Sequence, residues 1–171
     1  IVINGYGAHG AMPERSKDPV VIAMSLGQAM QSIVSRNVNP FESAVLSITQ
    51  IHSGSAYNVI PDDAKLCGTV RCFSEKVRMQ IRERMHALAA GMATAFDCEI
   101  KVDIRDGFSV LVNQEEHSKA VEDVARTIVG DANVITRAKP KMGSEDFADM
   151  LHAVPGAYFW VGHEGSVPVH N

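Results

Sequence analysis

The sequence is poor in cysteine and has no Cys-x-x-Cys pair. Its three cysteines are Cys67, Cys72 and Cys98, an odd number that argues against a disulfide framework and is typical of reduced thiols in a cytoplasmic protein. The sequence also lacks a signal peptide and any apolar run long enough to cross a bilayer. We therefore expect a cytoplasmic protein without a membrane segment.

Runs of basic residues are missing too. The 16 Lys and Arg residues are outnumbered by 20 Asp and Glu residues, which gives a formal net charge of -4. This balance argues against nucleic acid or an anionic membrane surface as the main partner. What is present is a chain of 171 residues that is 46% hydrophobic, enough for one larger core or two small ones.

The two ends of the sequence are unusual. It opens inside a predicted strand, Ile1-Val2-Ile3, without an initiator methionine, and it stops at Val169-His170-Asn171 without a closing element. We therefore expect a fragment of a longer polypeptide, whose other segments hold part of the chemistry.

A histidine stands between glycines near the start, in Gly5-Tyr6-Gly7-Ala8-His9-Gly10-Ala11-Met12-Pro13. Its small neighbours offer the His9 ring little to pack against, so the pattern favours a ring that points into an open site. An imidazole there can donate a proton or a hydrogen bond near neutral pH. The alternative is a glycine-rich turn that carries an idle surface histidine.

The first two-thirds of the chain alternates strands and helices. The predicted elements are a strand at residues 1–3, a helix that starts at Asp18-Pro19, strands at residues 44–51 and 64–73, a helix capped by Ser74, and a strand at residues 99–105. The order β-α-β-β-α-β is typical of a ferredoxin-like sandwich, with two helices on one face of a four-stranded antiparallel sheet. We place this domain at residues 1–106.

The pattern changes beyond Gly107. Asn113 and Glu116 resemble a capping box at the start of a helix that ends at Gly130, and a short helix at residues 142–147 and a buried strand at 157–161 are expected to follow. These elements are too few to close a second core. We expect residues 107–171 to be the C-terminal part of a larger α/β domain.

Eight short motifs occur in the order found in one family. They are Gly7 to Pro13, Asp18-Pro19-Val20, Ser35-Arg36-Asn37, Asn58 to Pro61, Gly68 to Arg71, Met142 to Phe147, Val154 to Ala157, and Val169-His170-Asn171. In these motifs the chain resembles the metal-dependent amidohydrolases of the aminoacylase and hippurate hydrolase type. The resemblance covers essentially the whole chain. It implies a dinuclear-metal α/β peptidase domain, interrupted by a ferredoxin-like lid that dimerises.

The resemblance also implies roles for three lid residues. His9 matches the histidine that reaches across the dimer and stabilises the oxyanion of the tetrahedral intermediate. Asn58 and Arg71 match positions that contact the substrate, and a guanidinium fork suits a carboxylate. Two alternatives stay open: Arg71 pairs with a neighbour in the sheet, or Asn58 only forms a turn.

Four further positions are implied to lie in the catalytic domain. Gly143, Ser144 and Glu145 match the loop beside the carboxylate end of the substrate, although Ser144 is equally suited to capping a helix. His170 matches the last metal ligand of the family. The resemblance implies two divalent ions (Zn, Mn, Co or Ni), whose other ligands, with the catalytic glutamate, precede the lid and are absent from this sequence.

The implied function is metal-dependent hydrolysis of N-acyl amino acids or of a related small peptide-like amide. The implied assembly is a homodimer through the lid, and pairing of dimers into tetramers stays open as an alternative. The fragment alone is expected to be inactive. A different class also fits the predicted sandwich, since this fold serves in non-catalytic dimerisation and in small-molecule-binding regulatory modules. The metal-ligating role implied for His170 favours the enzyme.

Overall fold

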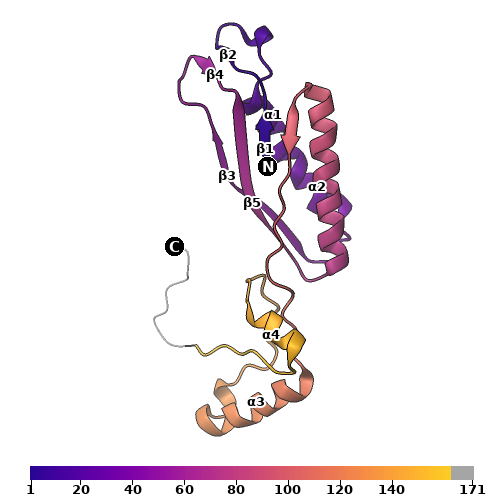
Figure 1. Ribbon diagram of the computed structural model, residues 1–171. Helices are drawn as coiled ribbons and strands as arrows, with labels where there is room; N and C mark the ends of the chain where they lie inside the picture. Colours follow the sequence, from indigo (N-terminus) through magenta and orange to yellow (C-terminus); the bar gives the residue numbers. More distant parts are fainter. Residues whose placement is uncertain (163–171) are drawn as a thin grey trace. The chain divides into compact units, whose positions relative to one another are not determined.

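The computed structural model describes residues 1–162 and has a mixed α/β architecture. The chain divides into two compact units, Ile1–Asp106 and Gly107–Asn171. We call them the first and the second unit and describe each by itself. The first unit holds the sheets, and the described part of the second contains helices joined by irregular segments (Figure 1).

A four-stranded antiparallel sheet forms the frame of the first unit. Its strands, in spatial order, are β3 (Ala44–Ser53), β5 (Asp63–Cys72), β1 (Val2–Asn4) and β6 (Glu99–Lys101). β6 is shorter than the predicted strand at residues 99–105. It ends at Lys101 because this residue pairs with Val2, where β1 begins, so later residues have no neighbouring strand to bond.

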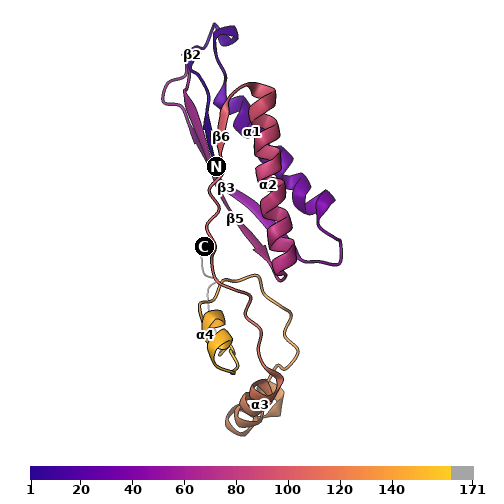
Figure 2. The ribbon, with the colours of Figure 1, turned by 45° about the vertical axis from the view of Figure 1, so that its right-hand side comes forward.

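Two long helices pack side by side on one face of this sheet (Figure 2). They are α1 (Pro19–Ser32) and α2 (Glu75–Phe96). Each begins at the predicted cap, because Asp18 accepts a hydrogen bond from the Val20 amide and Ser74 accepts one from the Val77 amide. Among residues 1–162, every helix is too short or too polar to span a bilayer.

The core of the first unit lies between the sheet and these helices. Ile3, Leu66, Leu26 and Ile81 come from the sheet and from both helices, and each is at most 2% exposed. Because side chains alternate along a strand, Ala64 and its even-numbered neighbours on β5 face this core. The odd-numbered residues of β5 lie on the opposite face.

Short elements complete the first unit. They are the strands β2 (Ala8–His9) and β4 (Val59–Ile60), which pair antiparallel as a separate two-stranded ribbon, the 3-10 turn η1 (Pro13–Arg15), and the π-helical turn η2 (Ile33–Asn37) that extends α1. The sequence patterns did not predict the ribbon, because two-residue strands carry no periodicity.

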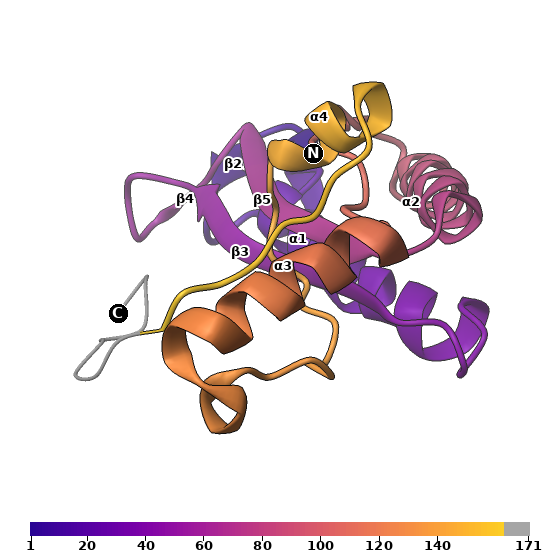
Figure 3. The same cartoon turned by 90° about the horizontal axis from the view of Figure 1, so that it is seen from below.

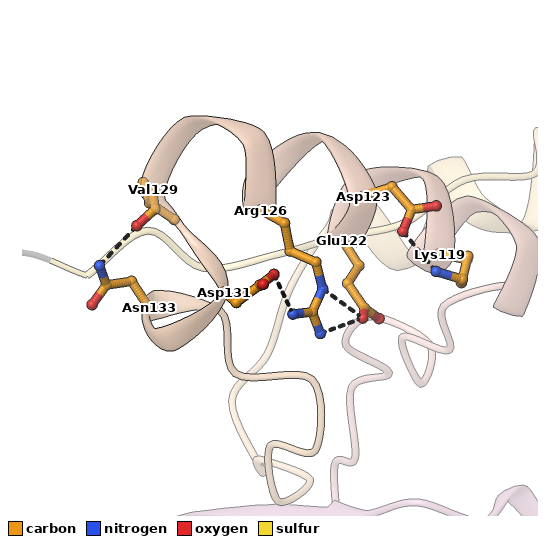
Figure 4. A network of polar contacts seen from close by, with 7 residues as sticks. All are labelled: Lys119, Glu122, Asp123, Arg126, Val129, Asp131 and Asn133. Atoms are coloured by element: carbon orange, nitrogen blue, oxygen red, sulfur yellow. Dashed lines mark hydrogen bonds and ion pairs between the residues drawn. The ribbon is translucent and has the colours of Figure 1, made fainter.

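The described residues of the second unit, 107–162, form two helices and one short turn. They are α3 (Glu115–Val129), η3 (Asp131–Asn133) and α4 (Phe147–Ala153). The half-buried Arg126 of α3 forms ion pairs with Glu122 on the same helix and with Asp131 of η3, at 2.7 and 2.8 Å (Figure 4). Gly130, with φ of 81°, ends this helix as predicted.

Three predictions for the second unit are wrong. No capping box forms, because Gln114 occupies the cap position of α3 and the side chain of Asn113 bonds the backbone of Tyr158 instead. The short helix starts at Phe147, not at residue 142. Residues 157–161 form no strand (Figure 3). Among the described residues, the backbone of this segment bonds a side chain, that of Asn113 at Tyr158, and not a neighbouring strand.

Candidate functional site

The β2–β4 ribbon brings two of the predicted site residues together. His9 pairs with Val59 across the ribbon, and the amide of Gly10 donates a 2.7 Å hydrogen bond to the carbonyl oxygen of Asn58. Both side chains are exposed. The backbones of residues 9–10 and 58–59 therefore lie side by side, and the β2–β4 ribbon lies at one end of the first unit (Figure 1).

Asp62 bonds the glycine-rich loop before His9 at two points. The sequence patterns did not single out this residue. The Gly5 amide donates to the Asp62 carbonyl at 2.7 Å, and the Gly7 amide donates to the Asp62 carboxylate at 2.8 Å. A Cβ on Gly7 would lie 2.6 Å from the carbonyl oxygen of Ile60. The glycine is therefore required by the close approach of two backbones.

One nitrogen of the His9 ring is already engaged. The amide of Ala11 donates a 3.1 Å hydrogen bond to Nδ1 of His9, so Nδ1 is the acceptor and the proton of the neutral ring sits on Nε2. That N–H belongs to an exposed side chain. The Nε2–H of His9 can therefore donate a hydrogen bond to a ligand bound beside the ribbon.

Arg71 lies apart from His9 and Asn58. It is near the far end of β5, about 27 Å from the Asp63 end at the usual rise per residue, and its odd number places it on the face of the sheet opposite α1 and α2. Its guanidinium donates to the carbonyl of the adjacent Val70 at 3.1 Å. Within residues 1–162 it makes no ion pair, so the alternative of a charged partner in the sheet is not supported.

The predicted substrate loop of the second unit is a loop in the structure, immediately before α4. Gly143 and Ser144 are exposed, and a Cβ on Gly143 would meet nothing within 4 Å. The alternative that Ser144 caps a helix does not hold, since the cap position of α4 belongs to Asp146. Both residues are available to a ligand.

Glu145 differs from its neighbours because both of its carboxylate oxygens are engaged. Oε2 accepts a 2.8 Å hydrogen bond from the hydroxyl of Tyr158, and Oε1 accepts one of 3.3 Å from the amide of Phe147. These donors, Tyr158 first, hold the pKa of Glu145 below its ordinary value, and the same bond raises the pKa of Tyr158. Glu145 is thus an ionised acceptor within the fold of the second unit.

A metal centre cannot be assembled from the described residues. Among residues 1–162, no three His, Cys, Asp or Glu side chains gather closely enough to hold an ion. The predicted ligand His170 lies outside the described residues.

Comparison with known proteins gives a consistent result over the whole chain. The family model of the peptidase family M20/M25/M40 matches residues 5–171. N-acetyl-L-cysteine deacetylase of Bacillus subtilis is 39% identical over 171 residues, and hippurate hydrolase of Campylobacter jejuni is 37% identical over 171 residues. The chain is covered completely in both alignments but spans only 40% and 45% of these relatives.

Solved structures also match this chain. A Bacillus subtilis protein described as a dinuclear metal-binding peptidase of the M20 family aligns with 99% of this chain and 43% of its own, at a TM-score of 0.69 and 26% identity. A putative aminohydrolase of Staphylococcus aureus aligns with 91% of this chain and 40% of its own, at a TM-score of 0.75 and 27% identity.

Proposed function

The chain belongs to the peptidase family M20/M25/M40, and on that premise we propose that the whole protein hydrolyses the amide bond of N-acyl amino acids. The observation that carries the proposal is the alignment of all 171 residues with a relative named as a deacetylase of an N-acetyl amino acid and with one named as a hippurate hydrolase. Both names describe removal of an acyl group from an amino acid. The products would be a carboxylic acid and a free amino acid.

The first unit is proposed to be a ferredoxin-like lid. The strand order β3-β5-β1-β6, with α1 and α2 on one face, supports this assignment. The second unit is proposed to be the C-terminal segment of the catalytic domain. In this proposal, the rest of that domain belongs to the part of the longer protein that the present chain does not include.

His9 is proposed to stabilise the oxyanion of the tetrahedral intermediate. Its Nε2–H is an exposed donor, oriented by the bond from the Ala11 amide to Nδ1. A donor preorganised at the position where negative charge develops lowers the barrier by about 3–4 kcal/mol.

Arg71 is proposed to bind the substrate carboxylate. Asn58, which lies apart from Arg71, is proposed to contact another part of a substrate, and the exposed Gly143-Ser144 loop is proposed as a substrate-binding loop of the second unit. Arg71 has a guanidinium without an ion pair among the described residues, and a planar fork of donors matches a carboxylate. Glu145 is less suited to contact that carboxylate, because its own charge would repel it. We therefore assign Glu145 a supporting position in the loop.

Two divalent ions are proposed as cofactors, with His170 as one ligand. When bound, such ions supply an activated water and an electrophile for the amide carbonyl. Because the described residues hold no group of three ligands, the remaining ligands are assigned to segments outside this chain. A cytoplasmic location is part of the same proposal, and the free thiols of Cys67, Cys72 and Cys98 are compatible with it.

The whole protein is proposed to be a homodimer through the lid. β3 is an edge strand of the sheet, and a groove of about 420 Å³ runs between it and α1. Met24 and Ile51 line this groove and are 57% and 53% exposed. An unpaired strand edge beside apolar side chains is a surface that favours pairing with a second copy.

Release of free amino acid by the full-length protein tests the proposed function. N-acetyl and N-benzoyl amino acids serve as substrates, with the protein reconstituted separately with zinc and with manganese. We expect release that depends on the metal. A folded, metal-loaded protein that releases no amino acid from any of these substrates would contradict the proposal.

A further inference from the structure

The segment at residues 156–160 forms an unexpected anchor inside the second unit. The side chain of Asn113 clamps Tyr158, because its Nδ2 donates to the Tyr158 carbonyl and its Oδ1 accepts from the Tyr158 amide, both at 2.8 Å. The amide of Gln114 also donates to the Gly156 carbonyl at 3.2 Å. The backbone of Tyr158 is therefore fixed against the start of α3.

The side chain of Tyr158 extends this anchor to the loop before α4. Its hydroxyl donates to Oε2 of Glu145 at 2.8 Å. Its ring centroid lies 5.6 Å from that of Phe147 and 5.6 Å from that of Trp160, the latter edge-on, and aromatic pairs at this spacing are stabilising. Tyr158 thus connects three segments of the second unit.

These contacts determine which groups the Glu145 carboxylate faces. With the Tyr158 hydroxyl on one oxygen and the Phe147 amide on the other, the carboxylate faces donors of its own unit. A free Glu145 carboxylate next to Gly143 and Ser144 would repel a substrate carboxylate bound at those residues, since two like charges at short range disfavour each other.

We propose that Tyr158 is a positioning residue that restrains the Glu145 carboxylate and so makes the Gly143-Ser144 loop selective for substrates with a free carboxylate. This inference rests on the proposed function. It deepens that proposal, because it assigns the selectivity of the loop to a residue that does not itself touch the substrate.

The experiment is a double-mutant cycle in the full-length, metal-loaded protein. Tyr158→Phe keeps the aromatic contacts and removes only the hydroxyl. We expect the KM for an N-acyl amino acid to rise about tenfold, because the released Glu145 carboxylate repels the substrate carboxylate, while kcat changes less than about twofold. In the double variant Tyr158→Phe, Glu145→Gln the unrestrained group is neutral, and the KM should fall several-fold below that of Tyr158→Phe.

Thr127→Val is the matched control, because it removes a hydroxyl hydrogen bond of 2.7 Å to the Val124 carbonyl within the same unit. Its KM should equal that of the wild type. A KM for Tyr158→Phe equal to that of the control, or a double variant no better than Tyr158→Phe, would overturn the inference. A wild-type protein that hydrolyses no N-acyl amino acid would instead overturn the proposed function, so the two failures are distinguishable.

Discussion

At the scale of single residues, the proposed chemistry of the first unit depends on one nitrogen of His9. The bond from the Ala11 amide leaves Nε2 as the donor, and the exposed position leaves that donor free to meet a ligand. The sequence predicted an imidazole with little to pack against, and this is what the structure has. Which nitrogen carries the proton could not be predicted, because it depends on the turn at Gly10.

Replacement of His9 tests this donor. We expect His9→Ala in the full-length protein to lower kcat by about 10²–10³-fold, as the loss of an oxyanion donor does, with its metal content unchanged. The matched control is His86→Ala, an exposed histidine on α2, which should keep wild-type turnover. A His9→Ala protein with wild-type kcat would remove His9 from the mechanism.

Arg71 is testable through affinity. Arg71→Ala should raise the KM for an N-acyl amino acid about 10–100-fold, the effect of losing a charged hydrogen bond, and Arg71→Lys should recover only part of it because an ammonium lacks the planar fork. Initial rates over a range of substrate concentrations measure both. Unchanged KM and kcat in Arg71→Ala would exclude Arg71 from the site.

Two residues with structural roles near the candidate sites escaped the sequence patterns. Asp62 follows Pro61 and precedes Asp63, and no pattern distinguishes the two acids, yet Asp62 holds Gly7 through its side chain. Tyr158 lies in the apolar run at residues 157–161, and that run predicted a strand. Both act through contacts with residues far along the chain, which composition and spacing do not encode.

At the scale of elements, the sequence predicted correctly the features that depend on contacts between residues close together in the chain. The helices that begin at Asp18-Pro19 and at Ser74 start where their caps indicated, since capping is a contact within a few residues. The predicted strand at residues 157–161 is wrong, since a strand exists only with a neighbour to pair with. The β2–β4 ribbon that positions His9 was not predicted for the same reason, because each of its strands exists only by pairing with the other.

The close approach within this ribbon gives a stability prediction. Gly7→Ala places a Cβ 2.6 Å from the Ile60 carbonyl oxygen, so it should lower the free energy of unfolding by about 1–3 kcal/mol. Gly91→Ala, on α2 with no atom within 4 Å of the added Cβ, should instead raise it by about 0.5–1 kcal/mol. Denaturant unfolding of the two variants measures both signs. Equal effects of the two changes would contradict the proposed packing.

The anchor at Asp62 gives a prediction about activity. Asp62→Ala removes the acceptor of the Gly7 amide and should lower kcat about tenfold, because a misplaced catalytic group loses rate steeply. Asp63→Ala changes an adjacent exposed acid whose side chain accepts no hydrogen bond among the described residues, and it is the control. If the two variants turn over N-acyl amino acids equally fast, the loop does not depend on Asp62.

At the scale of the whole molecule, the proposed function assigns only part of the site to this chain. It spans 40% and 45% of two relatives named as hydrolases, and residues 1–162 contain no cluster of metal ligands. In the first unit His9 and Asn58 stand together, whereas Arg71 is near the far end of β5. This separation supports a site that is completed by other segments and by a second copy.

Mixing two inactive variants of the full-length protein tests this account most directly. His9→Ala lacks the oxyanion donor and His170→Ala lacks the proposed metal ligand, so each alone should be nearly inactive. After subunit exchange, about a quarter of wild-type turnover of an N-acyl amino acid should return, because half of randomly formed dimers are mixed and each has one complete site. A mixture that gives no more than its two parents would contradict a His9 that acts in the partner's site.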